Sequence, residues 1–281
     1  IKQANNFTIN SIMKIIETQY NSWEGDPDLG EYSIGQGLMN NLDKLSDHYT
    51  YVYIALSPMI NNKGINYCQI IIDDICNKNK ETKLIFVCQH IFVNKINWGK
   101  NSIVFSTHSE FGSDIHPIPH YSAIYDTSKI KEERDILYSF IGHCGTNKIR
   151  EELVKLYPKY CFSTEGVWMS EKYRNKYIEL LGRSIFSLIP AGTGCSSMRL
   201  YESLSMKSIP VIISDNLRLP IPSVWDGMSI RVKECDIDRL EYVLCIYSEK
   251  DLKKMSENGQ QFWEKYCSDD NLYKIIIQTL K

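Results

Sequence analysis

The chain has 281 residues, 43% of them hydrophobic, and a formal charge of −2 from 32 basic and 34 acidic side chains. A length of this size predicts two domains or one large one, with enough apolar residues for sizeable cores. Nucleic-acid-binding proteins and membrane-surface proteins carry a basic surplus, so this balance argues against both, and we expect no nucleic-acid partner.

Two further absences shape the expectations. No apolar run reaches the roughly 18 residues of a membrane helix, and no basic-then-apolar leader opens the chain, so we expect no stable membrane anchor in this chain and a cytoplasmic location. The nine cysteines are scattered without a Cys-x-x-Cys pair, and we expect most of them to be reduced.

Alternating apolar and amphipathic patterns predict an α/β fold in the first half of the chain. We expect a short helix over residues 10–20, a long loop over 21–37 and a helix over 66–77. Runs of β-branched, aromatic and other apolar residues predict three strands, over 49–56, 83–89 and 102–106.

A polar, charged stretch over 126–135 is the best candidate for a linker. We therefore place one domain at 1–128 and a second at 129–266, with a C-terminal helix in 267–281 that can pack back on the first. In the second domain we expect one helix capped by Thr146 and one capped by Ser170 and closed by Gly182. Strands are expected over 136–142, 184–189 and 209–214, and residues 160–163 form a short apolar segment. Further helices are expected over 198–206, 238–247, 250–266 and from 270.

The most informative stretch runs from Pro190 to Glu202, because it is glycine-rich, follows a predicted strand and opens a predicted helix. Gly192 and Gly194 would let backbone N–H groups approach an anion closely. Ser196 and Ser197 would add hydroxyl donors at the positive end of the helix dipole. This pattern favours a phosphate-binding loop.

Arg199 and Glu202 lie three residues apart and therefore share a face of the same helix. A diphosphate needs a cation and N–H donors, whereas ribose hydroxyls need a carboxylate acceptor, and this face offers both. The alternative is a tight strand–helix turn with a surface Arg–Glu pair.

The same residues allow a second interpretation as a dinucleotide site. The spacing Gly192-x-Gly194-x-x-Ser197 nearly matches the Rossmann fingerprint, and Asp215 follows the next strand about 20 residues later, where an acidic residue would bind ribose. The third glycine of that fingerprint is replaced by Ser197, which weakens the match.

Residues 192–240 resemble the C-terminal half of the exostosin family, glycosyltransferase family 47. The resemblance rests on a Gly-x-Gly, a Ser, Arg-Leu-x-Glu, Ile-Pro-Val-Ile-Ile-x-Asp, Leu-Pro, a Trp and an acidic-Ile ending. These motifs stand here as Gly192, Gly194, Ser197, Arg199-Leu200, Glu202, Ile209–Ile213, Asp215, Leu219-Pro220, Trp225 and Asp236-Ile237 with Leu240.

Upstream segments extend the resemblance to about residues 85–245. Tyr138 to Gly142 followed by Arg150 is similar to the family's strand, glycine and arginine-bearing helix. Three shorter matches are Phe86 to His90, Ser109-Glu110 and Asp114-Ile115.

The resemblance implies a GT-B type enzyme, with two Rossmann-like domains facing each other across a cleft. The C-terminal domain would bind a nucleotide sugar, most simply a UDP-sugar, and the N-terminal domain a glycan or glycoprotein acceptor. The sugar would move by a single inverting displacement, without an obligatory metal and without a cofactor besides the donor.

The resemblance also implies roles for the individual donor-site residues. Arg150, Arg199 and the loop over 192–197 would stabilise the leaving diphosphate, and Glu202 would bind the ribose. Asp215 would lie near the donor pocket.

The general base is expected in the N-terminal half. His90 follows a predicted strand, and its ordinary pKa suits a base. Glu110 and Asp114 follow the third strand. The alternatives are a hydrogen-bonded rim histidine for His90 and solvated surface acids for the other two.

Other polar residues are interpreted more simply. We expect Asp73 and Asp74 on the polar face of a helix, and no metal site at His108, His116 and His120, which lack a metal-ligand frame. The triplets Asp26-Pro-Asp28 and Asp236-Ile-Asp238 favour a loop and a helix cap over a metal. Trp23 and Trp98 favour partial core burial over stacking on an acceptor sugar.

With no anchor and Ile-, Asn- and Lys-rich usage, the chain resembles most the short exostosin-like proteins of large algal DNA viruses, the chloroviruses. That likeness implies a host-cell cytoplasmic enzyme of capsid glycan synthesis, with a xylosyl donor as one expectation. Two other functions stay open: an NAD-type oxidoreductase, and a non-catalytic nucleotide-sugar or glycan-binding protein.

Overall fold

The structure is a computed structural model that describes residues 15–18, 29–122, 126–164, 171–268 and 270–281. Its contacts divide the chain into two units. Unit 1 comprises residues 1–107, 112–118 and 270–281, and unit 2 comprises residues 108–111 and 119–269. The C-terminal segment therefore groups with the first unit, and residues 108–111 group with the second.

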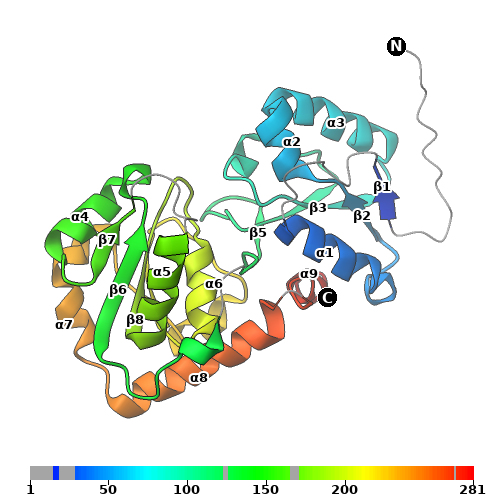
Figure 1. Ribbon diagram of the computed structural model, residues 1–281. Helices are drawn as coiled ribbons and strands as arrows, with labels where there is room; N and C mark the ends of the chain where they lie inside the picture. The colour runs from blue at the N-terminus through cyan, green and yellow to red at the C-terminus, as the bar shows by residue number, and fades with distance from the viewer. Residues whose placement is uncertain (1–14, 19–28, 123–125, 165–170, 269) are drawn as a thin grey trace. The chain divides into compact units, whose positions relative to one another are not determined.

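Unit 1 contains a parallel sheet whose strands follow one another in chain order (Figure 1). The strands are β1 (Ile15–Glu17), β2 (Tyr49–Tyr53), β3 (Lys83–Val87), β4 (Ser102–Ser106) and β5 (His116–Pro117). The helices are α1 (Leu29–Met39), α2 (Leu56–Lys63), α3 (Ile65–Lys78) and α9 (Lys274–Thr279), with 3₁₀ helices η1 (Leu42–Lys44) and η2 (Val93–Lys95).

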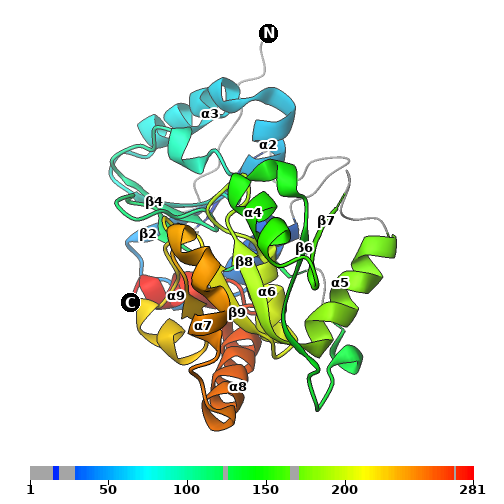
Figure 2. The ribbon, with the colours of Figure 1, turned by 90° about the vertical axis from the view of Figure 1, so that its left-hand side faces the viewer.

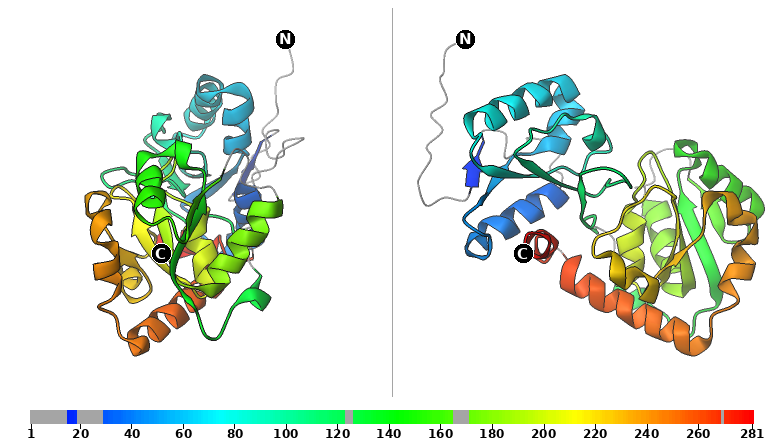
Figure 3. Two further views of the ribbon diagram at one scale, coloured as in Figure 1. Left: turned by 60° about the vertical axis from the view of Figure 1, so that its left-hand side comes forward. Right: turned by 180° about the vertical axis from the view of Figure 1, so that it is seen from behind.

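The core of unit 1 lies between the sheet and helices α2 and α3, where alternate strand residues such as Val52, Leu84 and Phe86 are buried. Helices α1 and α9 cover the other face (Figures 1 and 3). Pro58 lies in the first turn of α2, where its missing N–H has no intrahelical partner to lose.

Two expectations for the first 40 residues are wrong. Residues 15–17 form a strand and not part of a helix, because Ile15 and Ile16 pair in parallel with β2. Residues 29–37 belong to α1 and not to a loop. The glycines that suggested a loop are close-packing positions, since a Cβ on Gly35 or Gly37 would lie 2.4 Å from a tyrosine ring atom.

Unit 2 contains a second parallel sheet, in the order β10-β9-β8-β6-β7. The strands are β6 (Ile136–Gly142), β7 (Cys161–Ser163), β8 (Ser184–Pro190), β9 (Ile209–Ile213) and β10 (Ile230–Arg231). From β6 the chain moves outward to β7 and then returns past β6 to β8. The strand order therefore reverses between β6 and β8, as in flavodoxin-like folds, whose ligands bind at that reversal.

Helices cover both faces of the second sheet. The helices are α4 (Lys148–Leu156), α5 (Glu171–Arg183), α6 (Met198–Ser205), α7 (Leu240–Leu244) and α8 (Glu249–Tyr266), with 3₁₀ helices η3 (Thr127–Lys129), η4 (Cys144–Thr146), η5 (Pro222–Gly227) and η6 (Glu234–Arg239). Figures 1 and 2 show α4 and α7 on one face and α5 and α6 on the other. Strand residues alternate accordingly, so Phe140 is buried on the side of α4 and Ile141 on the side of α5.

The residues that begin and end two helices of unit 2 differ from the expected ones. Asn147, not Thr146, caps α4, because its side chain accepts from the backbone N–H of Ile149. Gly182 lies inside α5, which continues to Arg183, and a Cβ there would meet the carbonyl oxygen of Lys129 at 2.2 Å. The predicted cap Ser170 lies outside the described residues.

Two Rossmann-like units, each with a parallel sheet and flanking helices, confirm the predicted α/β fold of GT-B composition. The cleft between the domains stays a prediction, as do the assigned roles of the two domains. All nine cysteines are free thiols. Within the described ranges, no helix is long and apolar enough to cross a membrane.

Candidate functional site

The strand order of unit 2 reverses between β6 and β8, the place where open α/β sheets form a ligand-binding crevice at the carboxyl ends of their strands. The pairing of β6 with β8 extends to Ser139 and Ser187, although the two strands continue to Gly142 and Pro190. The segments that follow both strands therefore meet at the position where open α/β sheets bind ligands. Arg150, Arg199 and Glu202, three of the predicted donor-site residues, surround this position.

The predicted glycine loop follows β8. The backbone N–H of Gly192 donates to the carbonyl of Gly194 over 3.1 Å, so the loop folds back on itself. Ser197 lies just before α6 in extended conformation without a side-chain cap hydrogen bond. The buried Ser196 Oγ has no hydrogen-bond partner among the described residues.

Arg150 fastens this loop to the end of β6. Each nitrogen of its guanidinium donates to a backbone carbonyl: Nε to Ala191 over 2.9 Å, Nη1 to His143 over 3.2 Å and Nη2 to Pro190 over 3.4 Å. Burial and the nearby charge of Arg199 lower the pKa of Arg150 to about 10, so it stays protonated at neutral pH. Arg150 thus holds a positive charge beneath the loop.

Arg199 lies on α6 and crosses to the end of β6. Its Nη2 donates to the carbonyl of Ile141. Its guanidinium lies 4.7 Å from the ring centroid of Phe140 and 5.5 Å from that of Tyr177, distances at which cations are attracted to aromatic rings. Arg199 is buried, and no hydrogen-bond partner reaches its Nε among the residues that the structure describes.

Glu202 lies one turn further along α6 and is only 1% exposed. The hydroxyl of Tyr177 donates to its Oε2 over 2.6 Å, whereas Oε1 has no partner within the described part of the chain. Burial raises the pKa of Glu202 to about 7, against the opposing effects of Tyr177, Arg199 and Arg174. Because the carboxylate is closed off here, a ribose contact requires neighbouring groups to move.

Asp215 follows β9 and is exposed. It forms a reciprocal pair with Glu234: the N–H of Asp215 donates to Glu234 Oε1, and the N–H of Glu234 donates to Asp215 Oδ1, both over 3.2 Å. This pairing holds the segments after β9 and β10 together. Its predicted position near the donor stays a prediction.

Glu110 lies in a segment that is bound to the same edge of unit 2. Glu110 forms an antiparallel bridge with Leu217, and the N–H of Phe111 donates to the carbonyl of Asn216 over 3.1 Å. The segment also approaches the glycine loop. The Cys195 thiol donates to the carbonyl of Ser109 over 3.6 Å, and burial, followed by the charge of Glu110, raises the pKa of Cys195 to about 12.

His90 and Asp114 belong to unit 1. His90 Nδ1 accepts from the backbone N–H of Phe92 over 3.1 Å, so a neutral ring carries its proton on Nε2, which lies 3.0 Å from Asn61 Oδ1. Burial lowers the pKa of His90. Both ring nitrogens are therefore engaged, and a base role would require one of these bonds to break. Asp114 is exposed.

The remaining candidates have structural surroundings. Trp98 packs against the core of unit 1, with its ring 5.3 Å from that of Phe86. Asp73 and Asp74 are exposed on α3, and Asp74 pairs with Lys78. Asp236 and Asp238 lie inside η6 and do not cap it. Trp23, Asp26 and Asp28 lie outside the described residues.

The described residues contain no cluster of three or more His, Cys, Asp or Glu side chains that could hold a metal ion. His108 and His120 stack edge to face at 5.2 Å in unit 2, whereas His116 belongs to β5 of unit 1.

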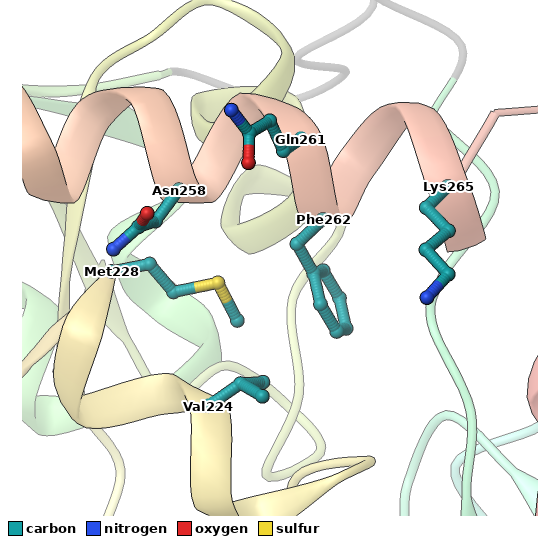
Figure 4. Close-up of a pocket in the computed structure, with 6 residues that line it drawn as sticks. All are labelled: Val224, Met228, Asn258, Gln261, Phe262 and Lys265. Carbon is teal, nitrogen blue, oxygen red and sulfur yellow. The ribbon is translucent and has the colours of Figure 1, made fainter.

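A pocket of about 360 Å³ opens elsewhere in unit 2, between η5 and α8 (Figure 4). Apolar side chains of Val224, Met228 and Phe262 line it beside three polar ones, Asn258, Gln261 and Lys265. None of the predicted donor-site residues lines this pocket.

Sequence reasoning missed the contribution of Tyr177 to the site. The spacing of Tyr173, Tyr177 and Leu180 indicates only the buried face of a helix. The hydrogen bond to Glu202 depends on how α5 and α6 pack on the same face of the sheet, and no local pattern encodes that.

The described fold is that of an α/β protein in which two buried arginines and a buried glutamate gather at a strand reversal. A family model described as the exostosin GT47 domain matches residues 76–245, more than half of the chain. The chain therefore belongs to the exostosin GT47 family, and the predicted family resemblance is confirmed.

Curated relatives match shorter segments. The chain is 38% identical over 105 residues to a protein of Oryza sativa subsp. japonica named "Probable glucuronosyltransferase Os03g0107900", covering 37% of this chain and 24% of that protein. It is 30% identical over 114 residues to the "Exostosin-1 homolog" of Caenorhabditis elegans, covering 38% and 30%. The matched segments thus span less than a third of each relative.

Among solved structures, AviGT4, a glycosyltransferase involved in avilamycin A biosynthesis, aligns over 89% of this chain and 88% of its own. The TM-score is 0.42 at 11% identity. The family assignment rests on the sequence match and not on this overlap.

Proposed function

We propose that the chain is a glycosyltransferase that binds a nucleotide-sugar donor, most simply a UDP-sugar, at the crevice between β6 and β8. The observation that carries this proposal is the pair of buried cations, Arg150 and Arg199, at the strand reversal next to the carboxylate of Glu202. Family membership supports the same activity.

In this proposal the two arginines stabilise the diphosphate that leaves when the sugar is transferred. Negative charge accumulates on the leaving oxygen, and fixed cations in a water-poor site stabilise it strongly. Arg150 acts mainly by holding the loop and contributing charge, because its nitrogens already donate to carbonyls. The Nε of Arg199 has no hydrogen-bond partner among the described residues, so it can donate to a ligand oxygen.

Glu202 would accept a hydrogen bond from a ribose hydroxyl. Its Oε1 has no partner in the described part of the chain, and an unpaired buried carboxylate oxygen is costly unless a ligand fills it. The glycine loop and Ser196 would complete the donor site.

The reaction would be a single displacement with inversion, in which an acceptor hydroxyl attacks the anomeric carbon, the bond to the diphosphate breaks, and a base takes the hydroxyl proton. Of the predicted bases, we favour Glu110. It is tied by backbone bonds to the loop after β9 and its charge reaches Cys195 in the glycine loop. His90 and Asp114 remain candidates.

The sugar and the acceptor are finer proposals. The names of matched relatives say glucuronosyltransferase, whereas the likeness to viral exostosin-like proteins implies xylose. We propose a glycan acceptor and no obligatory metal. Turnover of UDP-glucuronic acid and UDP-xylose, each with and without EDTA, decides which sugar is transferred and whether a metal is required. The viral likeness and the cytoplasmic location stay predictions.

The test of the activity is a comparison of UDP, GDP and NAD as stabilising ligands, followed by release of UDP from a UDP-sugar. UDP binding without turnover of any donor would favour the non-catalytic binding protein. The NAD-type alternative would place Asp215 on a ribose, but the Asp215 carboxylate is engaged by the N–H of Glu234. Stabilisation by NAD alone would overturn the proposal.

A further inference from the structure

Tyr177 of α5 contacts Arg199 and Glu202, the two residues of α6 that are predicted to bind the nucleotide sugar. Tyr177 is 3% exposed, its hydroxyl donates to Glu202 Oε2 over 2.6 Å, and its ring lies 5.5 Å from the Arg199 guanidinium. Burial raises the pKa of Tyr177 well above its usual value, so this hydroxyl stays protonated and remains a donor. The Tyr177 hydroxyl therefore binds Glu202 Oε2, whereas Glu202 Oε1 has no hydrogen-bond partner among the described residues.

Two buried atoms of this cluster, Glu202 Oε1 and Arg199 Nε, indicate which ligand groups would fit beside it. Glu202 Oε1 can only accept when the carboxylate is ionised, and Arg199 Nε can only donate. Neither has a hydrogen-bond partner among the described residues, and both are buried. A vicinal diol matches the pair, because one hydroxyl can donate to Oε1 while an oxygen accepts from Nε.

We propose that Tyr177 is a positioning residue for the ribose of the donor nucleotide, holding the Glu202 carboxylate so that Oε1 meets the ribose hydroxyl. This inference rests on the proposed function, since it assumes that a nucleotide binds beside Arg199 and Glu202. Tyr177 itself does not touch the reacting atoms.

The hydrogen bond also sets the charge state of Glu202. Burial raises the pKa of that carboxyl, whereas the Tyr177 hydroxyl on α5, Arg199 on α6 and Arg174 on α5 lower it. Removing the hydroxyl therefore raises the pKa of Glu202 further and leaves less carboxylate at neutral pH. A ligand that needs the carboxylate then binds well only at higher pH.

The substitution Tyr177→Phe tests this, because it removes the hydroxyl and keeps the ring. UDP affinity is measured by calorimetry between about pH 5.5 and 8.5 for wild type, Y177F and Glu202→Gln. Y177F is expected to weaken UDP binding at neutral pH by about fivefold or more. The pH midpoint of its binding curve is expected to move upward. Because E202Q has no carboxyl to titrate at this position, its binding curve shows the pH dependence that comes from UDP itself.

A matched control is Tyr138→Phe. Tyr138 lies on β6, and its hydroxyl also donates to a glutamate, to Oε1 of Glu241 on α7, over 2.5 Å. Y138F loses the same kind of bond away from the crevice, so its UDP affinity and pH midpoint are expected to match those of wild type.

The outcomes separate the inference from the function on which it rests. A wild-type chain that does not bind UDP overturns the proposed function. If wild type binds UDP and Y177F shows the same affinity and midpoint, the inference alone is overturned. If Y177F does not fold, the double variant Y177F/E202Q is compared with E202Q. Equal affinities support positioning through Glu202, and a further loss contradicts it.

Discussion

Gly192 and Arg150 are in such close contact that a Cβ on the glycine would lie 2.5 Å from Nη2 of the arginine. The arginine in turn donates to the carbonyls of Ala191 and Pro190, on the strand side of the glycine. The glycine is therefore required by the guanidinium beneath it. Its φ lies outside the left-handed region, so close approach and not backbone strain explains the residue.

The first prediction follows from this contact. Gly192→Ala should displace Arg150 or the loop, lower the free energy of unfolding by about 1–3 kcal/mol and weaken UDP binding by about tenfold. Thermal unfolding and calorimetry measure the two effects. Gly227→Ala is the control, since a Cβ there meets only Asn258 Nδ2 at 3.4 Å. Equal behaviour of the two variants would contradict the account.

The second prediction concerns the shape of the cation on α6. Arg199→Lys keeps the charge but loses the planar group that lies over Phe140 and Tyr177 and the bond to Ile141. We expect UDP affinity to fall by about tenfold, a cost of about 1–2 kcal/mol. Arg183→Lys, at an exposed ion pair with Asp135, should leave UDP affinity unchanged. Full UDP affinity in R199K would remove the assigned role of Arg199.

The third prediction concerns stability and pH. Burial raises the pKa of Glu202 from 4.5 in its ordinary state to about 7, so the folded chain binds this proton more tightly than the unfolded chain. The contribution of this group to stability is therefore full below about pH 4.5 and is lost as pH rises to about 7. Glu202→Gln should remove this loss and raise the free energy of unfolding at pH 8 by about 1–3 kcal/mol. Denaturant unfolding at pH 5 and pH 8 measures it, and an unchanged difference between the two pH values would contradict the shifted pKa.

The fourth prediction separates the candidate bases. Glu110→Gln should retain UDP affinity but lose transfer by about 10²-fold or more, because a base that takes the acceptor proton acts only in the chemical step. His90→Ala and Asp114→Asn serve as the parallel variants. Full transfer in E110Q would shift the role to whichever of these two loses it.

Sequence reasoning predicted the α/β class and the family, and it singled out the glycine loop, Arg199 and Glu202 because they lie within one short stretch. It did not predict how they are used. Arg150 binds carbonyls of a strand about 40 residues away, and Tyr177 reaches Glu202 from another helix, so both contacts depend on tertiary packing.

The errors have a common physical origin. Glycines in residues 29–37 and the short β1 were assigned from local propensity, whereas packing against Tyr53 and pairing with β2 decided their structure. Unit 1 gave few signals because its candidate residues, such as His90 and Asp114, lie in separate segments of the sequence.

The central claim is that the crevice between β6 and β8 binds the nucleotide of a sugar donor. Thermal unfolding of the wild-type chain and of Glu202→Ala, each with UDP, GDP or NAD, tests it most directly. The account predicts that UDP raises the unfolding temperature of wild type most and does not raise that of E202A. Stabilisation by NAD and not by UDP, or the same UDP effect in both chains, would contradict it.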